Sequence, residues 1–308
     1  MNICPITYEP TSERYSLKGL RRLSRSLTRL QDLPLTASEQ LSEAAARADK
    51  ISIAGAQPKL SARFDARAAS FVLVDEGADY ILKPPNPAFP SLPQNEDLTM
   101  RLAAIARIEV PFHGLVYARD GSMTYFIKRF DRGPRGARLA VEDFAQLSGR
   151  SRDTKYDSSM ERVVGVIQAH ATFPALECLR LFRLTLFCFL AGNEDMHLKN
   201  FSLITRRGKV ELSPAYDLVN STIAVGTARE ELALPLNGKK RNLTRNDLVR
   251  YFAGERMALE HRAVAKTLEQ LARAAGAFPG LIARSFLPQA KKERYVGLLD
   301  SRCRRLFG

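Results

Sequence analysis

Two aspartates and one asparagine lie close together in this chain, and side chains of these types can support phosphoryl transfer. Asn200 follows Asp195 by five positions, and Asp217 comes shortly after a β-prone run, Lys209 to Leu212. Phosphoryl transfer needs a carboxylate near the attacking hydroxyl and oxygen ligands for magnesium. The interval between Asp195 and Asn200 equals that between the Asp and the Asn of an H-R-D-x-x-x-x-N catalytic loop. These three residues are therefore candidates for that chemistry.

The competing interpretation treats each of these carboxylates as an ordinary helix cap or turn residue. That interpretation does not explain why the polar string from Asn193 to Asn200 directly follows an apolar helix. So many polar groups at a buried edge are costly unless they have partners or a purpose. The pattern therefore favours a functional site, within which we expect His197 to order the loop by hydrogen bonding.

A lysine at the end of an apolar strand is the second candidate. Lys83 ends the run from Tyr80, and Glu96 lies near the start of the following helical pattern. A lysine so placed can hold nucleotide phosphates, with a glutamate on the next helix to steady it. The alternative is a surface lysine before a proline-rich loop. The sequence around Lys83 leaves both interpretations open.

Two further segments have the composition of nucleotide-binding elements. Residues 51–60 join small residues to a β-prone run, and small residues let backbone N–H groups approach phosphates. With a single glycine, this spacing alone favours an ordinary turn between strands. Residues 125–132 form a strand that runs into charged residues. Such a connection borders the adenine pocket in two-lobed kinases, or it is an edge strand with a solvated end.

Composition limits the class of protein. The 308 residues suffice for a sizeable core, and no apolar run approaches the roughly 20 residues of a membrane helix. The first residues lack a charged start followed by an apolar core, so we expect no secretory signal and no membrane association. The four cysteines are scattered without a metal-binding or disulfide pattern, which favours a reducing cytoplasm.

The net charge of +14 has two explanations. One is a surface that binds nucleic acid or another anionic partner. The other is a generally basic protein that binds phosphates in one cleft. Arginine is spread through the whole chain with short clusters such as Lys239 to Arg241, which favours the second explanation.

The order of predicted elements indicates an α+β protein with a sheet-rich first part and a helix-rich second part. We predict two domains, residues 1–130 and 131–308. Strands are predicted at residues 71–74, 80–83, 125–128 and 209–212, and helices at residues 96–108, 159–170, 176–191 and within 244–307.

In the candidate residues described above, and in further short strings, the chain resembles the HipA-family serine/threonine kinases, the toxins of bacterial toxin–antitoxin modules. The short N-terminus and the opening from Tyr15 to Leu23 look like the HipT branch, in which a separate small protein supplies an N-terminal subdomain. The matching strings run in order between about residues 50 and 220: Ser52–Leu60, Ile81–Pro84, Asn95–Glu96, Arg129–Arg132, Glu142–Gln146, Lys155–Tyr156, Gly192–Asn200 and Tyr216–Asp217.

The resemblance implies a bilobal protein-kinase-like fold, with Mg²⁺ and ATP as donor and protein hydroxyls as acceptors. By motif match, Asp195 is the catalytic base, Asn200 and Asp217 hold magnesium, and Lys83 holds the phosphates. Residues 128–130 border adenine. The candidate ATP-binding set is Ser52, Ala54, Gly55, Gln57, Lys83, Lys128, Arg129, Phe130, His197 and Lys199.

The resemblance also implies substrates, partners and regulation. Family members phosphorylate aminoacyl-tRNA synthetases, tryptophanyl-tRNA synthetase in the HipT branch. Expected partners are a HipB-like DNA-binding antitoxin, a small HipS-like protein, or both, so that DNA is contacted only through the antitoxin. Autophosphorylation is expected at Ser52; Ala54 replaces the second serine that HipT-type loops often carry. The alternatives are a small-molecule kinase and a catalytically dead regulatory module.

Overall fold

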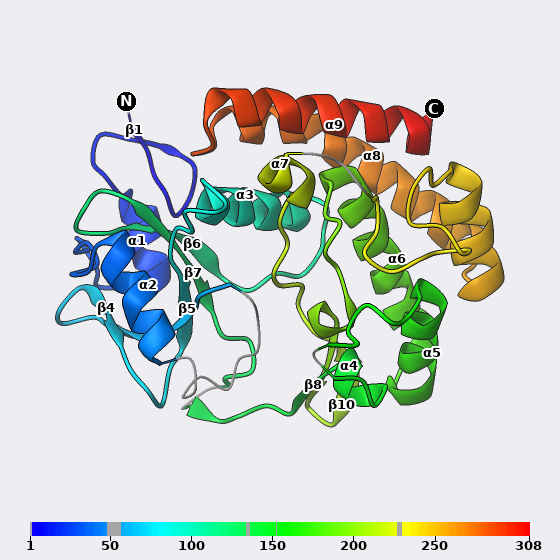
Figure 1. Ribbon diagram of the computed structural model, residues 1–308, viewed down its shortest axis with the longest axis horizontal. Helices are drawn as coiled ribbons and strands as arrows, with labels where there is room; N and C mark the ends of the chain where they lie inside the picture. The colour runs from blue at the N-terminus through cyan, green and yellow to red at the C-terminus, as the bar shows by residue number, and fades with distance from the viewer. Residues whose placement is uncertain (1, 48–56, 134–135, 152, 227–229) are drawn as a thin grey trace. The chain divides into compact units, whose positions relative to one another are not determined.

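The structure is a computed structural model, and it describes residues 2–47, 57–133, 136–151, 153–226 and 230–308. The chain forms two compact units, whose elements are labelled in Figure 1. Unit 1 comprises Met1–Leu98, Pro111–Ala137 and Ala283–Pro288, and unit 2 comprises Thr99–Val110, Arg138–Ile282 and Gln289–Gly308. Each unit is thus built from three segments that are not contiguous in the chain. The sequence predicted two contiguous domains that meet at residue 130.

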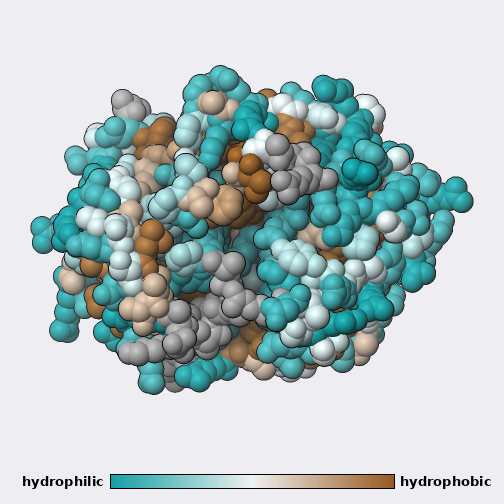
Figure 2. All heavy atoms as spheres, viewed as in Figure 1, coloured by the Kyte–Doolittle hydropathy of each residue, from teal (hydrophilic) through white to brown (hydrophobic). Residues whose placement is uncertain are grey.

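Hydrophilic residues cover most of the face seen in Figure 2, and the apolar residues on it form small separate groups. This distribution follows from burial of the large apolar side chains inside each unit. Among the helices in the described ranges, none combines the length and the apolar character that crossing a bilayer requires.

Unit 1 is built around a five-stranded antiparallel sheet with the strand order β4-β3-β5-β7-β6. A short two-stranded sheet and two helices precede these strands in the chain, and a longer helix, α3, starts in this unit. The elements are β1 (Asn2–Ile3), β2 (Pro10–Thr11), α1 (Leu17–Leu23), α2 (Ala37–Ala46), β3 (Leu60–Asp65), β4 (Ser70–Leu73), β5 (Tyr80–Lys83), α3 (Leu92–Ile105), β6 (His113–Tyr117) and β7 (Met123–Lys128).

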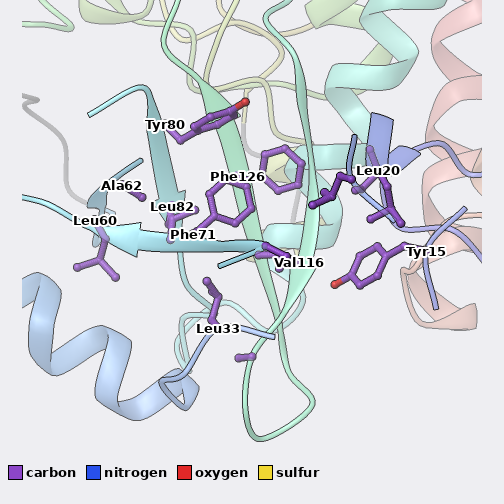
Figure 3. Close-up of a cluster of buried hydrophobic side chains, with 14 of the residues drawn as sticks. Tyr15, Leu20, Leu33, Leu60, Ala62, Phe71, Tyr80, Leu82, Val116 and Phe126 are labelled. Atoms are coloured by element: carbon purple, nitrogen blue, oxygen red, sulfur yellow. The ribbon is translucent and has the colours of Figure 1, made fainter. Parts of the chain in front are cut away.

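The middle strand of this sheet is β5, because β3 pairs with one of its edges and β7 with the other. Its aromatic and branched residues suit a pleated surface that is buried. Aromatic rings from three strands form the core beside it: Phe71 lies 5.0 Å from Phe126 and 5.2 Å from Tyr80 between ring centroids (Figure 3). This core fixes the position of Lys83, the last residue of the middle strand.

Unit 2 consists mainly of helices, with a three-stranded antiparallel sheet in the order β10-β9-β8. The elements that follow β7 in the chain are β8 (Val141–Asp143), α4 (Phe144–Leu147), α5 (Met160–His170), α6 (Pro174–Ala191), η3 (Leu198–Asn200), β9 (Ser202–Arg206), β10 (Lys209–Leu212), α7 (Ser221–Val225), η4 (Asn246–Arg256), α8 (His261–Ala283) and α9 (Gln289–Phe307).

Helix α6 lies at the centre of unit 2 and packs against α5, η4 and α9 (Figure 1). Pro174 occupies its first turn, where a missing N–H costs nothing. Every residue from Leu184 to Ala191 is buried, as expected for a helix that is apolar nearly all round. The helix ends at Gly192, and the polar string that contains Asp195 begins there.

The predicted elements correspond closely to strands β4, β5, β7 and β10 and to helices α5 and α6. Helix α3 begins at Leu92, earlier than the predicted start at Glu96, because Pro93 is tolerated in a first helical turn. Strands β3, β6, β8 and β9 were not predicted.

Candidate active site

Lys83 forms a buried ion pair within unit 1. Its Nζ donates to Glu96 Oε1 at 2.5 Å, and its side chain is only 3% exposed while that of Glu96 is fully buried. A buried lysine at this strand end is not the surface residue that one interpretation of the sequence allowed. Because removing two charges from water is costly, such a pair persists where its geometry is good. Glu96 lies on α3, the helix that follows β5, as the phosphate-binding hypothesis requires.

A second buried pair, which the sequence analysis missed, lies beside the first. His113 Nδ1 and Asp97 Oδ1 are 2.8 Å apart, and both side chains are buried. Glu96 and Asp97 are neighbours on α3 and reach β5 and β6 respectively. The consecutive polar residues Asn95, Glu96 and Asp97, all of them buried, were the available sequence signal. The two pairs tie this end of α3 to the sheet.

In unit 2, the loop that carries Asp195 starts from a left-handed glycine. Gly192 has φ of +69°, and a Cβ atom there would lie 2.4 Å from Leu298 Cδ2 and 3.0 Å from Thr222 Oγ1. The Gly192 carbonyl accepts hydrogen bonds from the backbone N–H and the hydroxyl of Thr222, the latter at 3.3 Å. Only glycine fits this position without strain. The start of the loop is therefore fixed to α7 and packed against α9.

The loop fixes the backbone of Asp195 from both sides. The Asp195 N–H donates to Asn193 Oδ1 at 3.0 Å, and the Asp195 carbonyl accepts from Asn200 Nδ2 at 2.9 Å. The Asp195 side chain is exposed, whereas Asn193 and Asn200 are buried. An exposed carboxylate on a fixed backbone can accept the proton of an incoming hydroxyl. The five-residue spacing is thus the spacing that brings the Asn200 amide to the Asp195 carbonyl.

The orientation of the Asn200 amide determines which of its atoms could bind a cation. Because Nδ2 donates to Asp195, the amide presents Oδ1 as its remaining acceptor. Amide and carboxylate oxygens are the hard ligands that Mg²⁺ takes, commonly with only one or two carboxylates from the protein. Among the described residues there is no group of three or more His, Cys, Asp or Glu side chains arranged for a metal. The donor set of Asn200 and Asp217 suits magnesium held together with phosphates.

Asp217 lies in a strained backbone conformation. Its φ is +55°, a region that residues other than glycine enter rarely and at some energetic cost. The preceding Tyr216 is partly buried and restrains this segment, since its hydroxyl donates to the Lys199 carbonyl at 2.9 Å. Burial also raises the pKa of Tyr216. Tyr216 therefore connects the Asp217 segment to the loop that contains Asp195 and Asn200.

His197 and Lys199 are held by contacts inside unit 2. The backbone N–H of His197 donates to the Asp195 carbonyl at 2.9 Å, while its Nδ1 is buried with no hydrogen-bond partner among the described residues. Burial lowers the pKa of His197, so its ring is neutral at pH 7. Lys199 Nζ pairs with Asp143 Oδ2 at 2.8 Å. The loop is thus ordered by the His197 backbone, and Lys199 is already paired with a carboxylate.

Other candidate nucleotide-binding residues lie in unit 1. Lys128 ends β7 with an exposed side chain, and Arg129 and Phe130 are partly buried. Arg129 forms two hydrogen bonds to Asp131, at 2.9 and 2.6 Å. Gln57 is partly buried with its Nε2 unpaired among the described residues. Ser52, Ala54 and Gly55 fall outside the described residues.

Tyr156 is a site residue to which the sequence analysis gave no role. Its hydroxyl donates to Asp195 Oδ1 at 2.5 Å across 39 positions of sequence. A contact between residues so far apart follows from tertiary structure and leaves no periodic signal in the sequence. The string Lys155–Tyr156 was noticed only as part of the resemblance.

The sheet-rich unit 1, the helical unit 2 and the Asp195 loop define a protein with a kinase-like α+β fold. Solved structures of this fold include a chain of the HipA, HipB and operator DNA complex of Shewanella oneidensis MR-1, with a TM-score of 0.66 and 23% identity over 91% of this chain and 72% of that one. The Helicobacter pylori proinflammatory kinase CtkA aligns with a TM-score of 0.53 and 15% identity over 73% of this chain and 86% of that one.

The family model for the HipA-like C-terminal domain matches residues 51–278. The chain belongs to this family, as the sequence motifs predicted; the assignment to the HipT branch stays a prediction.

Relatives of the chain are named as kinases. "Putative kinase Y4dM" of Sinorhizobium fredii is 35% identical over 68% of this chain, and "Putative kinase" of Haemophilus influenzae is 28% identical over 94% of it. The "Serine/threonine-protein kinase toxin HipA" of Shewanella oneidensis is 29% identical over 56%. The matches span 54% of the Y4dM protein, 93% of the Haemophilus protein and 43% of the Shewanella toxin.

Proposed function

We propose that this protein is an ATP-dependent serine/threonine protein kinase. The observation that carries the proposal is the geometry of the Asp195 loop, in which an exposed carboxylate sits on a backbone fixed by Asn193 and Asn200. The buried pair of Lys83 and Glu96 supports it, because a lysine steadied in this way can hold nucleotide phosphates. Family membership adds support from relatives named as kinases.

In this proposal each residue has one task. Asp195 accepts the proton of the acceptor hydroxyl, and Lys83 holds the phosphates of ATP while Glu96 keeps the lysine in place. Asn200 and Asp217 would hold magnesium, which when bound neutralises charge on the transferring phosphoryl group. The strained φ of Asp217 fits this task, since such strain is kept where the surrounding structure requires one conformation.

We further propose that the kinase is the toxin of a HipBST- or HipBA-type toxin–antitoxin module. The Shewanella relative is named a kinase toxin, and the related structure contains HipA, HipB and operator DNA. On this basis we expect a HipB-like antitoxin, a small HipS-like protein, or both as partners. The substrate we favour is an aminoacyl-tRNA synthetase, with the tryptophanyl enzyme first, on the resemblance to the HipT branch.

Ser52 is the proposed autophosphorylation site. A phosphate there would add roughly −1.5 to −2 charges beside the phosphates of ATP and so repel the loop. Intact-mass spectrometry after incubation with Mg-ATP tests this step. We expect added phosphate on the wild-type protein and none on Ser52→Ala; equal incorporation in both would move the site elsewhere.

Radiolabelled ATP added to the purified protein and a cell extract distinguishes the possible functions. A labelled protein band that depends on the added protein supports the proposal. Label in a small metabolite would identify a small-molecule kinase instead. If no label is transferred, the chain is a regulatory module without catalytic activity, and the proposal falls. The variant Asp300→Asn, which removes an exposed carboxylate of α9, is the control and should label as wild type does.

A further inference from the structure

The hydroxyl of Tyr156 makes a short hydrogen bond to the carboxylate of the proposed base. Tyr156 belongs to the loop before α5, and its Oη lies 2.5 Å from Asp195 Oδ1. Tyr156 is 41% exposed, so the contact lies at an accessible place rather than in a sealed core. Because Tyr156 is partly exposed, burial alone does not hold its hydroxyl against the carboxylate, and specific contacts must do so.

The other contacts of Asp195 restrain its backbone and leave its side chain untouched. Asn193 accepts from the Asp195 N–H, while Asn200 Nδ2 and the His197 N–H both donate to the Asp195 carbonyl. Within the described ranges, Tyr156 is the one residue that hydrogen-bonds to the carboxylate oxygens. Rotation of the carboxylate about its side-chain bonds is therefore restrained by Tyr156.

Tyr156 is itself positioned by contacts that do not involve its hydroxyl. The Leu198 N–H donates to the carbonyl of the neighbouring Lys155 at 3.2 Å, which ties this loop to the loop of Asp195. The Tyr156 ring packs edge-on against His197, with 5.0 Å between centroids and 83° between planes. The Lys155 ammonium lies 5.0 Å from the centre of the same ring. These contacts hold the Tyr156 ring in place independently of its hydroxyl.

The protonation state suits a donor. Burial and the nearby Asp195 carboxylate raise the pKa of Tyr156, and the charge of Glu230 acts in the same direction. The phenol therefore keeps its proton at neutral pH and donates it to Oδ1. Hydrogen bonds to charged groups are stronger than neutral ones, so this contact can fix a side chain that solvent would otherwise let rotate.

We propose that Tyr156 is a positioning residue for the base, and this inference rests on the proposed function. Tyr156 anchors Oδ1, which leaves Oδ2 to accept the proton of the acceptor hydroxyl. As that proton moves to Oδ2, the acceptor oxygen bonds to the γ-phosphorus, and the bond from phosphorus to the bridging oxygen breaks with its electron pair to ADP. Tyr156 keeps its own proton throughout. Anchoring one oxygen removes the need to order the carboxylate during the reaction.

The variant Tyr156→Phe tests this proposal, since it keeps the ring on His197 and removes only the hydroxyl. The readout is the rate of ³²P transfer to the extract protein that the wild type labels, measured over dilutions of extract and of ATP. We expect the maximal rate to fall about 10- to 100-fold, the loss typical of a hydrogen bond to a charged group. The ATP concentration at half-maximal rate and the melting temperature should stay as in the wild type.

Two further variants separate positioning from a structural role. Tyr251→Phe removes another phenol-to-carboxylate bond of unit 2, between Tyr251 and Glu161 at 3.2 Å, and should keep the wild-type rate. When Asp195 is already replaced by Asn, the additional change Tyr156→Phe should slow transfer little further. The reason is that the Tyr156 hydroxyl acts only through the Asp195 carboxylate, so the two effects are not additive.

The proposal is overturned if Tyr156→Phe transfers phosphate at the wild-type rate, or if it slows transfer equally with and without Asp195. A faster Tyr156→Phe would also overturn it and would mean that the hydroxyl occupies the place of the acceptor. If the wild type labels no protein at all, the proposed function itself has failed, and Tyr156 has no transfer to assist.

Discussion

Among the single residues of the candidate site, Lys83, Glu96 and Asp195 each have a defined ion-pair or hydrogen-bond partner. Lys83 and Glu96 are buried together at the end of the middle strand of the unit 1 sheet, while Asp195 is exposed on a fixed backbone. A buried pair of this kind is a poor source of stability compared with apolar residues of similar size. Its retention in the core therefore favours a role in binding over a role in folding.

Substitutions at Lys83 and Glu96 should affect stability and nucleotide binding differently. Glu96→Gln leaves the Lys83 ammonium buried without its carboxylate, so the free energy of unfolding should fall by about 3–5 kcal/mol. The double variant Lys83→Met with Glu96→Leu should recover most of that loss, because apolar residues can replace a buried pair. Denaturant unfolding measures both stabilities, and calorimetry with Mg-ATP measures nucleotide binding.

Nucleotide binding should not return in the double variant. If calorimetry finds wild-type affinity for Mg-ATP without either charge, Lys83 does not hold the phosphates, and the assignment in unit 1 is wrong.

At the scale of elements, helix α6 and its end at Gly192 position the loop of Asp195. The apolar residues Leu184 to Ala191 bury the helix, and the left-handed glycine turns the chain at a point packed against Leu298. The Asp217 segment is connected to the same loop by Tyr216. The loop that carries the exposed Asp195 thus depends on a junction that is itself tightly packed.

Gly192→Ala should therefore destabilise unit 2 by more than the conformational penalty alone. Alanine in a left-handed conformation costs about 1–2 kcal/mol, and the close contacts of the new Cβ should add about 1–3 kcal/mol. Gly208→Ala is the matched control, since Gly208 has φ of +73° and a Cβ there would meet no heavy atom within 4 Å. Urea unfolding of both variants isolates the packing contribution as their difference; equal losses would show that the junction is not tightly packed.

The sequence predicted these elements where the local signal was strong. The long apolar run of α6 and the aromatic and branched residues of β5 and β7 suffice to identify them. Strand β6 was not predicted because Gly114 interrupts its β-prone pattern. The structure explains the glycine at this position, since a Cβ atom there would lie 2.8 Å from the Phe126 ring. Residue spacing identified Asp195 and Asn200, whereas Tyr156 is brought to them by tertiary structure alone.

At the scale of the whole molecule, each unit gathers segments from distant parts of the chain. The last helix, α9, belongs to unit 2, although Ala283–Pro288 just before it belongs to unit 1. Glu231 holds α9 through Arg305, at 2.5 and 3.1 Å, and also accepts from the Leu243 N–H at 2.8 Å. Residues well beyond Asp217, where the last matching string ends, thus complete the packing of unit 2.

The Glu231 contacts predict a dependence of stability on pH. Burial raises the pKa of Glu231, but the hydrogen bonds from Arg305 and Leu243 outweigh it and hold the pKa below the ordinary value of 4.5. A carboxyl group with a lowered pKa in the folded state stabilises the protein above about pH 4.5, and this contribution is lost as the pH falls through the folded-state value. Glu231→Gln should lower the free energy of unfolding at pH 7 by about 1–3 kcal/mol.

The difference between Glu231→Gln and wild type should stay constant from pH 7 to about pH 4.5 and shrink as the pH falls below that value, as urea unfolding at several pH values can measure. Glu269→Gln, which removes an exposed pair with Arg273, is the control and should change stability little at any of these pH values. A constant difference across the range would mean that the ionised form of Glu231 is not what holds α9.

The rate of ³²P transfer by Asp195→Asn, with Mg-ATP affinity measured alongside, tests the proposed role of Asp195 as the base for phosphoryl transfer from ATP. Because Asp195 is exposed, the variant should fold and bind Mg-ATP as the wild type does. We predict a rate at least about a hundredfold lower, the usual contribution of general base catalysis. A rate within a few-fold of wild type, at unchanged affinity, would mean that Asp195 is not the base.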